Sequence, residues 1–258
     1  MSAIHLDVVD LRDFYGRPLG RVARRMVARA IRRCWPNVGG MTVVGLGYAG
    51  PYLGAFRDEA VRTVALMPAQ QGVVHWPREG PYLSGLVDET SLPLPDSCAD
   101  RLLLVHQLEA ADQLGPALRE AWRVLAPNGR LLIVAPNRRG LWARIERTPF
   151  GHGQPFSRAQ LVALLRRALF TPLEWSHALF MPPLGWRVLL RGASAWERVG
   201  ALLWPRLSGV ILVEATKQIY APAGHAERVR ARLPLRAPVR ATAPARVPSC
   251  RERSRLLP

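Results

Sequence analysis

The chain has 258 residues, of which 49% are hydrophobic and 21% charged. This is enough to bury one sizeable core, and it excludes a disordered polymer. Lysine and arginine number 36 against 19 acidic residues, which gives a formal net charge of +17. The positive charge favours binding to nucleic acid, anionic lipid or acidic partners, and it does not distinguish among them. A GC-biased coding sequence rich in arginine codons explains the charge equally well.

The cysteines, Cys34, Cys98 and Cys250, are odd in number and widely spaced. Neither a disulfide framework nor a zinc site is therefore expected. Acidic residues interrupt any apolar run near the N-terminus, and no stretch reaches the roughly 18 apolar residues of a membrane span. We expect a cytoplasmic protein that holds no metal.

The first predicted element is an amphipathic helix over residues 19–35. Apolar residues recur at helical spacing on one side, and arginines occupy most of the other. Two interpretations fit this pattern: a helix packed on the domain with its basic face in water, or a helix that binds anionic lipid or RNA. Pro36 and the turn at 37–40 end the helix. Residues 1–40 are expected to form a basic helical cap.

A strand, a glycine turn and a helix start are predicted next. Residues 41–44 are able to form a buried strand and lead into Gly45, Gly47 and Gly50. Pro51 then suits the first position of a helix, where its missing N–H costs nothing. Glycines let a ligand approach the backbone, and the N–H groups of the helix start favour a polar or anionic group. This arrangement predicts a site for a nucleotide-type cofactor.

The spacing of the three glycines is also that of the dinucleotide fingerprint. That motif needs an acidic residue about 20 positions further on to hold the ribose. A short helix over 52–61 and a buried strand over 61–67 are expected to follow, and this strand ends at Met67 and Pro68 instead of an acid. A nicotinamide-dependent oxidoreductase is therefore only the third hypothesis.

The remainder of the domain alternates between predicted strands and helices. One strand ends near Val87, and the apolar run 102–105 leads into His106. A helix over 114–125 and a strand over 130–135 follow. This alternation predicts an α/β fold with a doubly wound, mostly parallel sheet and helices on both faces.

Four pieces, in this order, resemble the class I S-adenosylmethionine-dependent methyltransferases, in particular the small-molecule type called type 11. They are VVGLGYAGPYL, DETSLPLPDSCADRLLLVHQLE, LREAWRVLAPNGRLLIVAPN and PFGHGQPFSRAQLVALL. The resemblance implies a Rossmann-like domain over 41–220, with closing strands at 175–179 and 210–217, the last one antiparallel. It also implies S-adenosyl-L-methionine as the cofactor, with a small-molecule or lipid-like acceptor that the sequence does not identify.

The resemblance also assigns cofactor-binding residues. Gly45, Gly47 and Gly50 would line the methionine end of the cofactor, and Asp88 would accept from the adenine amino group with Glu89 beside it.

The chain departs from the family pattern at two carboxylates. Gly45 stands where the family has an acid that closes the first strand, and Met67 stands at the ribose position. Two lost charged hydrogen bonds, each worth about 1.5–3 kcal/mol, would weaken binding about a hundredfold or more unless they are replaced. This motivates the alternative hypothesis of a non-catalytic scaffold or regulatory protein with a methyltransferase fold.

The chemistry requires a base only where the acceptor carries a proton. His106, His152 and Tyr15 are the catalytic candidates, because imidazole titrates near neutrality and a phenol can relay a proton. Each candidate also has a structural interpretation. His106 can simply end a strand, His152 can belong to a loop ordered by glycines, and Tyr15 can pack the N-terminal cap.

Two segments lie outside this scheme. Residues 184–207 combine tryptophans with arginines, which suits a lid helix over a hydrophobic acceptor, an interfacial helix or an ordinary packed insertion. Residues 221–258 are rich in proline and arginine and lack an apolar period. This tail is expected to be disordered and to contact RNA or anionic surfaces.

Overall fold

The computed structural model describes residues 7–185, 190, 192–204 and 207–219. These residues form a seven-stranded sheet in the order β3-β2-β1-β4-β5-β7-β6. The strands are β1 (Thr42–Gly47), β2 (Arg62–Pro68), β3 (Ser84–Val87), β4 (Ala99–Val105), β5 (Leu125–Pro136), β6 (Phe170–Ala178) and β7 (Val210–Lys217). β7 is antiparallel to both of its neighbours, whereas the other pairs are parallel. The predicted α/β sheet with an antiparallel last strand is confirmed.

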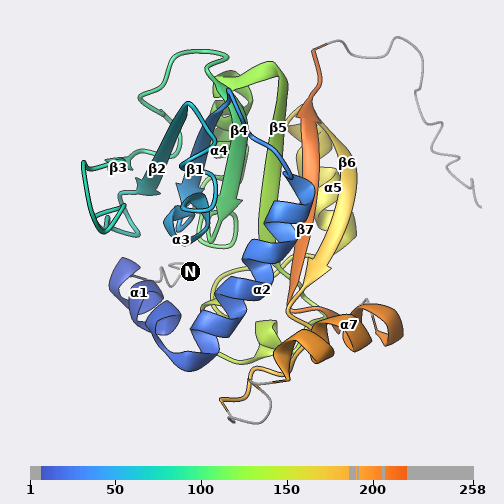
Figure 1. Ribbon diagram of the computed structural model, residues 1–258. Helices are drawn as coiled ribbons and strands as arrows, with labels where there is room; N and C mark the ends of the chain where they lie inside the picture. Colours follow the sequence, from blue (N-terminus) through green and yellow to red (C-terminus); the bar gives the residue numbers. More distant parts are fainter. Residues whose placement is uncertain (1–6, 186–189, 191, 205–206, 220–258) are drawn as a thin grey trace, which may run out of the picture. The chain divides into compact units, whose positions relative to one another are not determined.

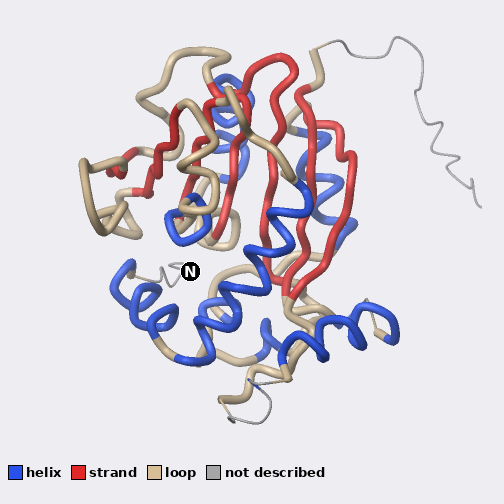
Figure 2. Tube along the Cα trace, in the orientation of Figure 1, coloured by secondary structure: helices blue, strands red, loops and turns tan. Residues whose placement is uncertain are grey.

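Helices cover both faces of the sheet (Figures 1 and 2). The described helices are α1 (Val8–Gly16), α2 (Pro18–Cys34), α3 (Gly50–Leu53), α4 (Leu114–Val124), α5 (Arg158–Arg167) and α7 (Ala193–Leu203), with short 3-10 turns at Trp142–Arg144 and Pro149–Gly151. The side chain of Asp7 caps α1 by accepting from Val9 N. Ser157 and Gln160 form a reciprocal capping box at the start of α5, which satisfies two backbone donors there.

The sheet separates two hydrophobic cores. One core joins α1, α2 and α3 to one face, and the other joins α4 and α5 to the opposite face. Successive residues of a strand point to opposite faces. Accordingly Met67 belongs to the first core and Leu66 to the second. This alternation also separates the two hollows described below.

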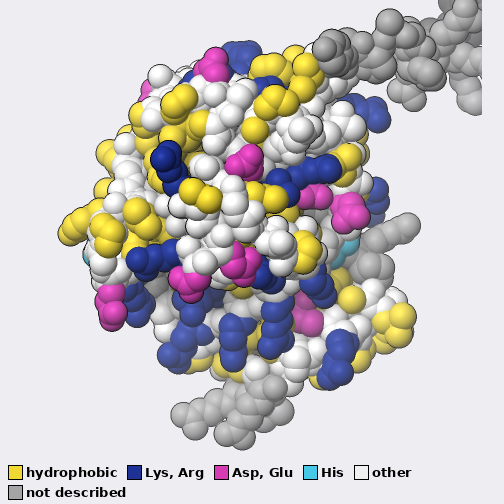
Figure 3. All heavy atoms as spheres, turned by 45° about the horizontal axis from the view of Figure 1, so that its top comes forward, with side chains coloured by type: hydrophobic (Ala, Val, Ile, Leu, Met, Phe, Trp, Pro, Cys, Tyr) yellow, Lys and Arg dark blue, Asp and Glu magenta, His cyan; other side chains and the backbone are white. Residues whose placement is uncertain are grey.

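The basic amphipathic helix forms as predicted, within one residue at each end, as α2. Its apolar side, which includes Val22, Met26 and Ile31, is buried against the first core. Most of its arginines point outward, with Arg21 and Arg25 exposed. Figure 3 shows Lys and Arg side chains gathered across the lower half of one face of the molecule.

One predicted element is wrong in extent. A helix was expected over 52–61, but α3 ends at Leu53 and residues 54–60 form turns. Gly54 occupies the C-cap, and glycine, which lacks Cβ, weakens a helix at that point. Similarly, β5 begins at Leu125 and thus starts earlier than the expected 130.

Several expectations fall only partly within the described residues. α7 lies inside the segment 184–207, and its role as a lid stays a prediction. The tail 221–258 lies outside the described residues. Among the described helices, none has the length and apolar character needed to cross a membrane. The same part of the chain contains no group of three or more His, Cys, Asp or Glu residues that could hold a metal ion.

Candidate active site

The carboxyl ends of β1 and β4 meet at Gly47 and Val105, which are paired across the sheet. Gly47 has a φ of 74°, and a Cβ added there would lie 2.4 Å from the carbonyl oxygen of Val105. The next residue, Tyr48, donates its N–H to the same carbonyl at 2.8 Å. Gly47 is therefore required by the close approach of two strand ends.

The other two glycines of the turn also allow close packing. A Cβ on Gly45 would lie 2.6 Å from the Cβ of Ala49, so Gly45 lets α3 pack on β1. A Cβ on Gly50 would lie 3.3 Å from Cδ1 of Trp76. All three glycines thus have a structural role, and their contact with a cofactor stays a prediction.

Four buried side chains form a hydrogen-bonded chain at this edge of the sheet. The hydroxyl of Tyr52 lies 3.0 Å from that of Tyr15, which lies 2.8 Å from Nε2 of His106. Nδ1 of His106 lies 2.9 Å from Oε1 of Glu109. Tyr15 comes from α1, which lies beyond the carboxyl ends of the strands (Figure 1). We call this set the Tyr–His–Glu chain.

The carboxylate fixes the direction of the Tyr–His–Glu chain. An ionised Glu109 only accepts, so Nδ1 of His106 carries the proton and Nε2 accepts from Tyr15. Burial, with a smaller contribution from Tyr52, raises the pKa of Tyr15 well above its usual value. The phenol therefore stays protonated and can donate. The arrangement provides a base, His106, held in one tautomer by the carboxylate of Glu109.

Three buried acceptor atoms near the Tyr–His–Glu chain have no hydrogen-bond partner within the described residues. They are Oε1 of Gln71, Oε1 of Gln107 and Oε2 of Glu109, and these residues are only 3%, 3% and 6% exposed. A buried polar group without a partner costs about 1–3 kcal/mol. Each of these oxygens can therefore accept a hydrogen bond from a bound water or from a ligand that brings donors.

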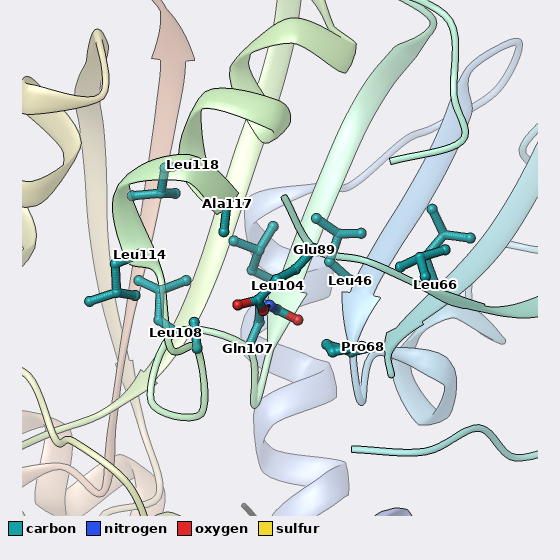
Figure 4. A pocket seen from close by; sticks show the side chains of 12 residues that line it. Leu46, Leu66, Pro68, Glu89, Leu104, Gln107, Leu108, Leu114, Ala117 and Leu118 are labelled. Atoms are coloured by element: carbon teal, nitrogen blue, oxygen red, sulfur yellow. Dashed lines mark hydrogen bonds between the residues drawn. The ribbon is translucent and has the colours of Figure 1, made fainter. Parts of the chain in front are cut away.

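A first hollow lies on the α4 side of the sheet and is nearly filled. Its lining residues are mostly apolar, with Glu89 and Gln107 among them, and its volume is about 10 Å³. Figure 4 shows these two side chains among leucines and Pro68. Nε2 of Gln107 donates to the carboxylate of Glu89. This space holds about one water at most, so the chain's own side chains close it.

A second cavity lies on the α2 and α3 side and has a volume of about 290 Å³. We call it the arginine cavity. Its lining residues are Arg12, Tyr15, Gly16, Arg24, Tyr48, Gly50, Pro51, Gly54, Met67, Val74, His75, Trp76 and Arg78. Because Tyr15 belongs to both, the arginine cavity adjoins the Tyr–His–Glu chain.

Three of the six predicted cofactor residues line these spaces, whereas Gly45, Gly47 and Asp88 line neither. Gly50 and Met67 line the arginine cavity, and Glu89 lines the first hollow. Asp88 lines neither: it is exposed, and its Oδ1 accepts from the backbone and side chain of Thr90. The side-chain hydrogen bond from Thr90 lowers the pKa of the Asp88 carboxyl.

The predicted catalytic residues are only partly brought together. Tyr15 and His106 are in direct contact. Nε2 of His152 instead contacts the backbone carbonyl of Glu146. Its loop nevertheless comes close, because the ring centroid of Phe150 lies 5.0 Å from that of His106.

Sequence reasoning missed several residues of the site. Gln107 and Glu109 follow the apolar run of β4 directly, and polar side chains at the carboxyl end of a buried strand are a usable signal. Tyr52 and Gln71 carry no such signal, because only the packing of α3 and of the loop after β2 brings them here.

One family model matches part of the chain. Residues 44–133 match the model of the methyltransferase domain family described as type 11. The search of curated proteins gives no match.

Solved structures of the same fold cover most of the chain. A Haloferax volcanii protein solved with the Trm112 methyltransferase activator is 19% identical, with a TM-score of 0.58 over 82% of this chain and 99% of that one. An S-adenosylmethionine-dependent methyltransferase from Thermotoga maritima is 17% identical, with a TM-score of 0.56 over 82% and 96%. The cyclase SpnF is 21% identical, with a TM-score of 0.54 over 76% and 81%. At these identities the likeness establishes the fold.

Proposed function

We propose that this chain transfers a methyl group from S-adenosylmethionine to a small-molecule or lipid-like acceptor, since residues 44–133 match the model of a methyltransferase domain. The observation that carries the proposal is the set of three buried acceptors on Gln71, Gln107 and Glu109, which have no donor among the described residues. They lie beside a glycine turn at the carboxyl edge of a doubly wound sheet, where ligands of such folds bind.

The residues present fit the cofactor in their hydrogen-bonding character. S-adenosylmethionine offers an ammonium group, two ribose hydroxyls and an adenine amino group as donors. Glu109, Gln107 and Gln71 would hold the ammonium and the hydroxyls, and Glu89 with Asp88 would hold the amino group. Binding of the purine requires the first hollow to open, because Gln107 and Glu89 close it in this structure.

The chain's own groups supply positioning and a route for a proton. When bound, S-adenosylmethionine supplies an electrophilic methyl group, which leaves with cleavage of its carbon–sulfur bond. Tyr15 faces the arginine cavity and donates to Nε2 of His106. An acceptor proton can move to the oxygen of Tyr15 while the phenol proton moves to Nε2, and Glu109 stabilises the imidazolium that results.

Calorimetry with S-adenosylhomocysteine, the demethylated product, tests the proposal. We expect binding in the micromolar to sub-millimolar range, weakened about tenfold or more by Glu109→Gln because a charged hydrogen bond is lost. The matched control is Glu79→Gln, an exposed residue that lines neither space. Absence of binding at millimolar ligand would remove the methyltransferase proposal.

A second candidate function has its own support. The first hollow is almost filled, and Met67 stands where a ribose-binding acid is expected. Both favour a non-catalytic scaffold or regulatory protein with this fold. The same fold occurs in SpnF, which is described as a cyclase, in keeping with the rule that a fold does not fix a reaction. This candidate requires a protein that binds no S-adenosylhomocysteine and retains a stable partner in pull-downs.

A further partner is proposed for the basic face of α2. Four of its arginines, Arg21, Arg25, Arg29 and Arg33, are exposed. Such a face would contact RNA or an anionic surface, and the contact would weaken steeply with salt. Titration with RNA and with anionic vesicles at two salt concentrations, using Arg25→Gln/Arg29→Gln as the variant, tests it. Equal binding by the variant and the parent protein would contradict it.

A further inference from the structure

The arginine cavity has an unbalanced positive charge. Three arginines from separate segments line it: Arg12 from α1, Arg24 from α2 and Arg78 from the loop after β2. Among the described residues that line the cavity, none is acidic. Like charges brought together repel one another, so this convergence is most stable when an anion lies between the arginines.

The arginines retain free hydrogen-bonding capacity. Among the described residues, Arg12 has one ion pair, an exposed one with Asp13 at 3.4 Å. Arg24 and Arg78 pair with no carboxylate in the described part of the chain. The three arginines also act on Tyr48 in the cavity wall. Burial, the largest effect, raises the pKa of Tyr48, and Asp13 raises it slightly. The positive charges of Arg12, Arg24 and Arg78 lower this pKa. Guanidinium groups favour carboxylates and phosphates, which they bind through two parallel hydrogen bonds.

The walls of the cavity are flat and aromatic. The rings of Tyr15 and Tyr48 are stacked, with centroids 5.5 Å apart and an interplanar angle of 15°. Trp76 lies against Gly50, and Met67 lies at the end of β2. Stacked rings and a thioether form a surface for a planar apolar group. The volume, about 290 Å³, is at the small end of ligand pockets, which start near 300 Å³.

We propose that the arginine cavity binds the methyl acceptor, and that this acceptor is a small molecule with a carboxylate or phosphate group on a planar apolar body. The arginines hold the anionic group, and the aromatic walls hold the body. The inference rests on the proposed methyl transfer, because it is Tyr15 in the cavity wall that reaches His106. It narrows the acceptor from any small or lipid-like molecule to an anionic planar one.

Two sources can supply the same anionic chemistry. One is the acceptor, and the other is the carboxylate of the cofactor's own methionine end, since Gly50 and Met67, which the family resemblance assigns to the cofactor, line the same cavity. The two sources differ in what happens once the cofactor site is saturated. An acceptor site stays available for an added anion, whereas a carboxylate already held by the arginines blocks it.

Calorimetry on the full chain separates these cases. S-adenosylhomocysteine is titrated first, and phenyl phosphate is then titrated into the free and the saturated protein. Benzyl alcohol, a neutral ring, and inorganic phosphate, which has no ring, serve as comparison ligands. The variant is Arg24→Gln/Arg78→Gln, and the matched control is Arg25→Gln, an exposed arginine of the same helix outside the cavity lining.

We expect phenyl phosphate to bind the saturated protein more tightly than either comparison ligand. The double variant should weaken this binding about tenfold or more, through the loss of charged hydrogen bonds, and should leave the affinity for S-adenosylhomocysteine unchanged. A variant that loses S-adenosylhomocysteine affinity, together with no phenyl phosphate binding to the saturated protein, would overturn the inference. In a third outcome, S-adenosylhomocysteine does not bind, but phenyl phosphate binds and its binding is weakened in Arg24→Gln/Arg78→Gln. The methyl-transfer proposal would then be wrong. The cavity would be an anion site of another kind, which overturns the acceptor role.

Discussion

The hydroxyl of Tyr15 and Nε2 of His106 lie 2.8 Å apart in the buried interior, although 91 positions separate them in the chain. This contact ties the N-terminal helix α1 to the end of β4. Because Tyr15 lines the arginine cavity, the contact also connects the cavity wall to His106. Among the described residues, His106 is the only histidine with a ring nitrogen paired to a carboxylate, that of Glu109. The N-terminal cap thus contributes to the site as well as to the core.

Removal of the Tyr15 hydroxyl tests this connection. Tyr15→Phe keeps the ring that stacks on Tyr48 but removes the donor to His106 and the acceptor for Tyr52. General acid–base groups contribute about 10²–10⁴-fold, so we expect a loss of methyl transfer of about a hundredfold for an acceptor that must lose a proton. Affinity for S-adenosylhomocysteine should change little. Tyr82→Phe, at an exposed position, is the control, and full activity in Tyr15→Phe would exclude the relay.

Glu109 is predicted to act through both of its oxygens. Oε1 meets Nδ1 of His106, and Oε2 has no partner in the described structure. In Glu109→Gln the amide oxygen can still accept from His106, but an NH₂ group then replaces the free acceptor. We expect S-adenosylhomocysteine affinity to fall about 10- to 100-fold. A thermal unfolding midpoint within a few degrees of the parent protein would show that the loss concerns binding; unchanged affinity would contradict the assignment.

Most of the fold can be predicted from the sequence. Buried strands give continuous apolar runs, as in residues 102–105, and the strand β7 matches its predicted range of 210–217. The failure at 52–61 begins at Gly54, the C-cap of α3. Glycine weakens a helix, but in a sequence pattern it is a less definite break than a proline. The antiparallel direction of the last strand came from the family resemblance, because periodicity alone does not specify how strands pair.

The site is less predictable because its contacts are long-range. Tyr15 and His106 were both candidates, but no spacing rule links a helix of the cap to a strand end 91 residues later. The three arginines of the cavity come from three segments, and each one alone resembles the many other arginines of a basic chain. The closure of the first hollow by Gln107 and Glu89 depends on side-chain packing that sequence patterns do not encode.

Gly47 should tolerate no side chain. Its φ of 74° costs an L-residue about 1–2 kcal/mol, and a Cβ would collide with the carbonyl of Val105 at 2.4 Å. Gly47→Ala should therefore lower the free energy of unfolding by more than that strain alone. The matched control is Gly54→Ala, where the backbone is helical and nothing lies within 4 Å of the added Cβ. Urea unfolding of both variants checks this, and equal midpoints would show that the turn relaxes.

Alkaline pH should destabilise the protein through its buried tyrosines. Burial raises the pKa of Tyr15 and Tyr52, whereas both titrate near about 10 in the unfolded chain. Below that pH both states are protonated and the full stability is present. As the pH rises above it, the unfolded chain releases protons that the folded chain retains, so the free energy of unfolding falls.

Urea unfolding at about pH 9 and about pH 11 measures this loss of stability. The loss between the two pH values should be smaller in Tyr52→Phe than in the parent protein by roughly 1 kcal/mol, since one pKa unit is about 1.4 kcal/mol. Tyr82→Phe, whose residue is 75% exposed, should behave like the parent, and a Tyr52→Phe curve with the parental slope would show that Tyr52 ionises freely in the folded state.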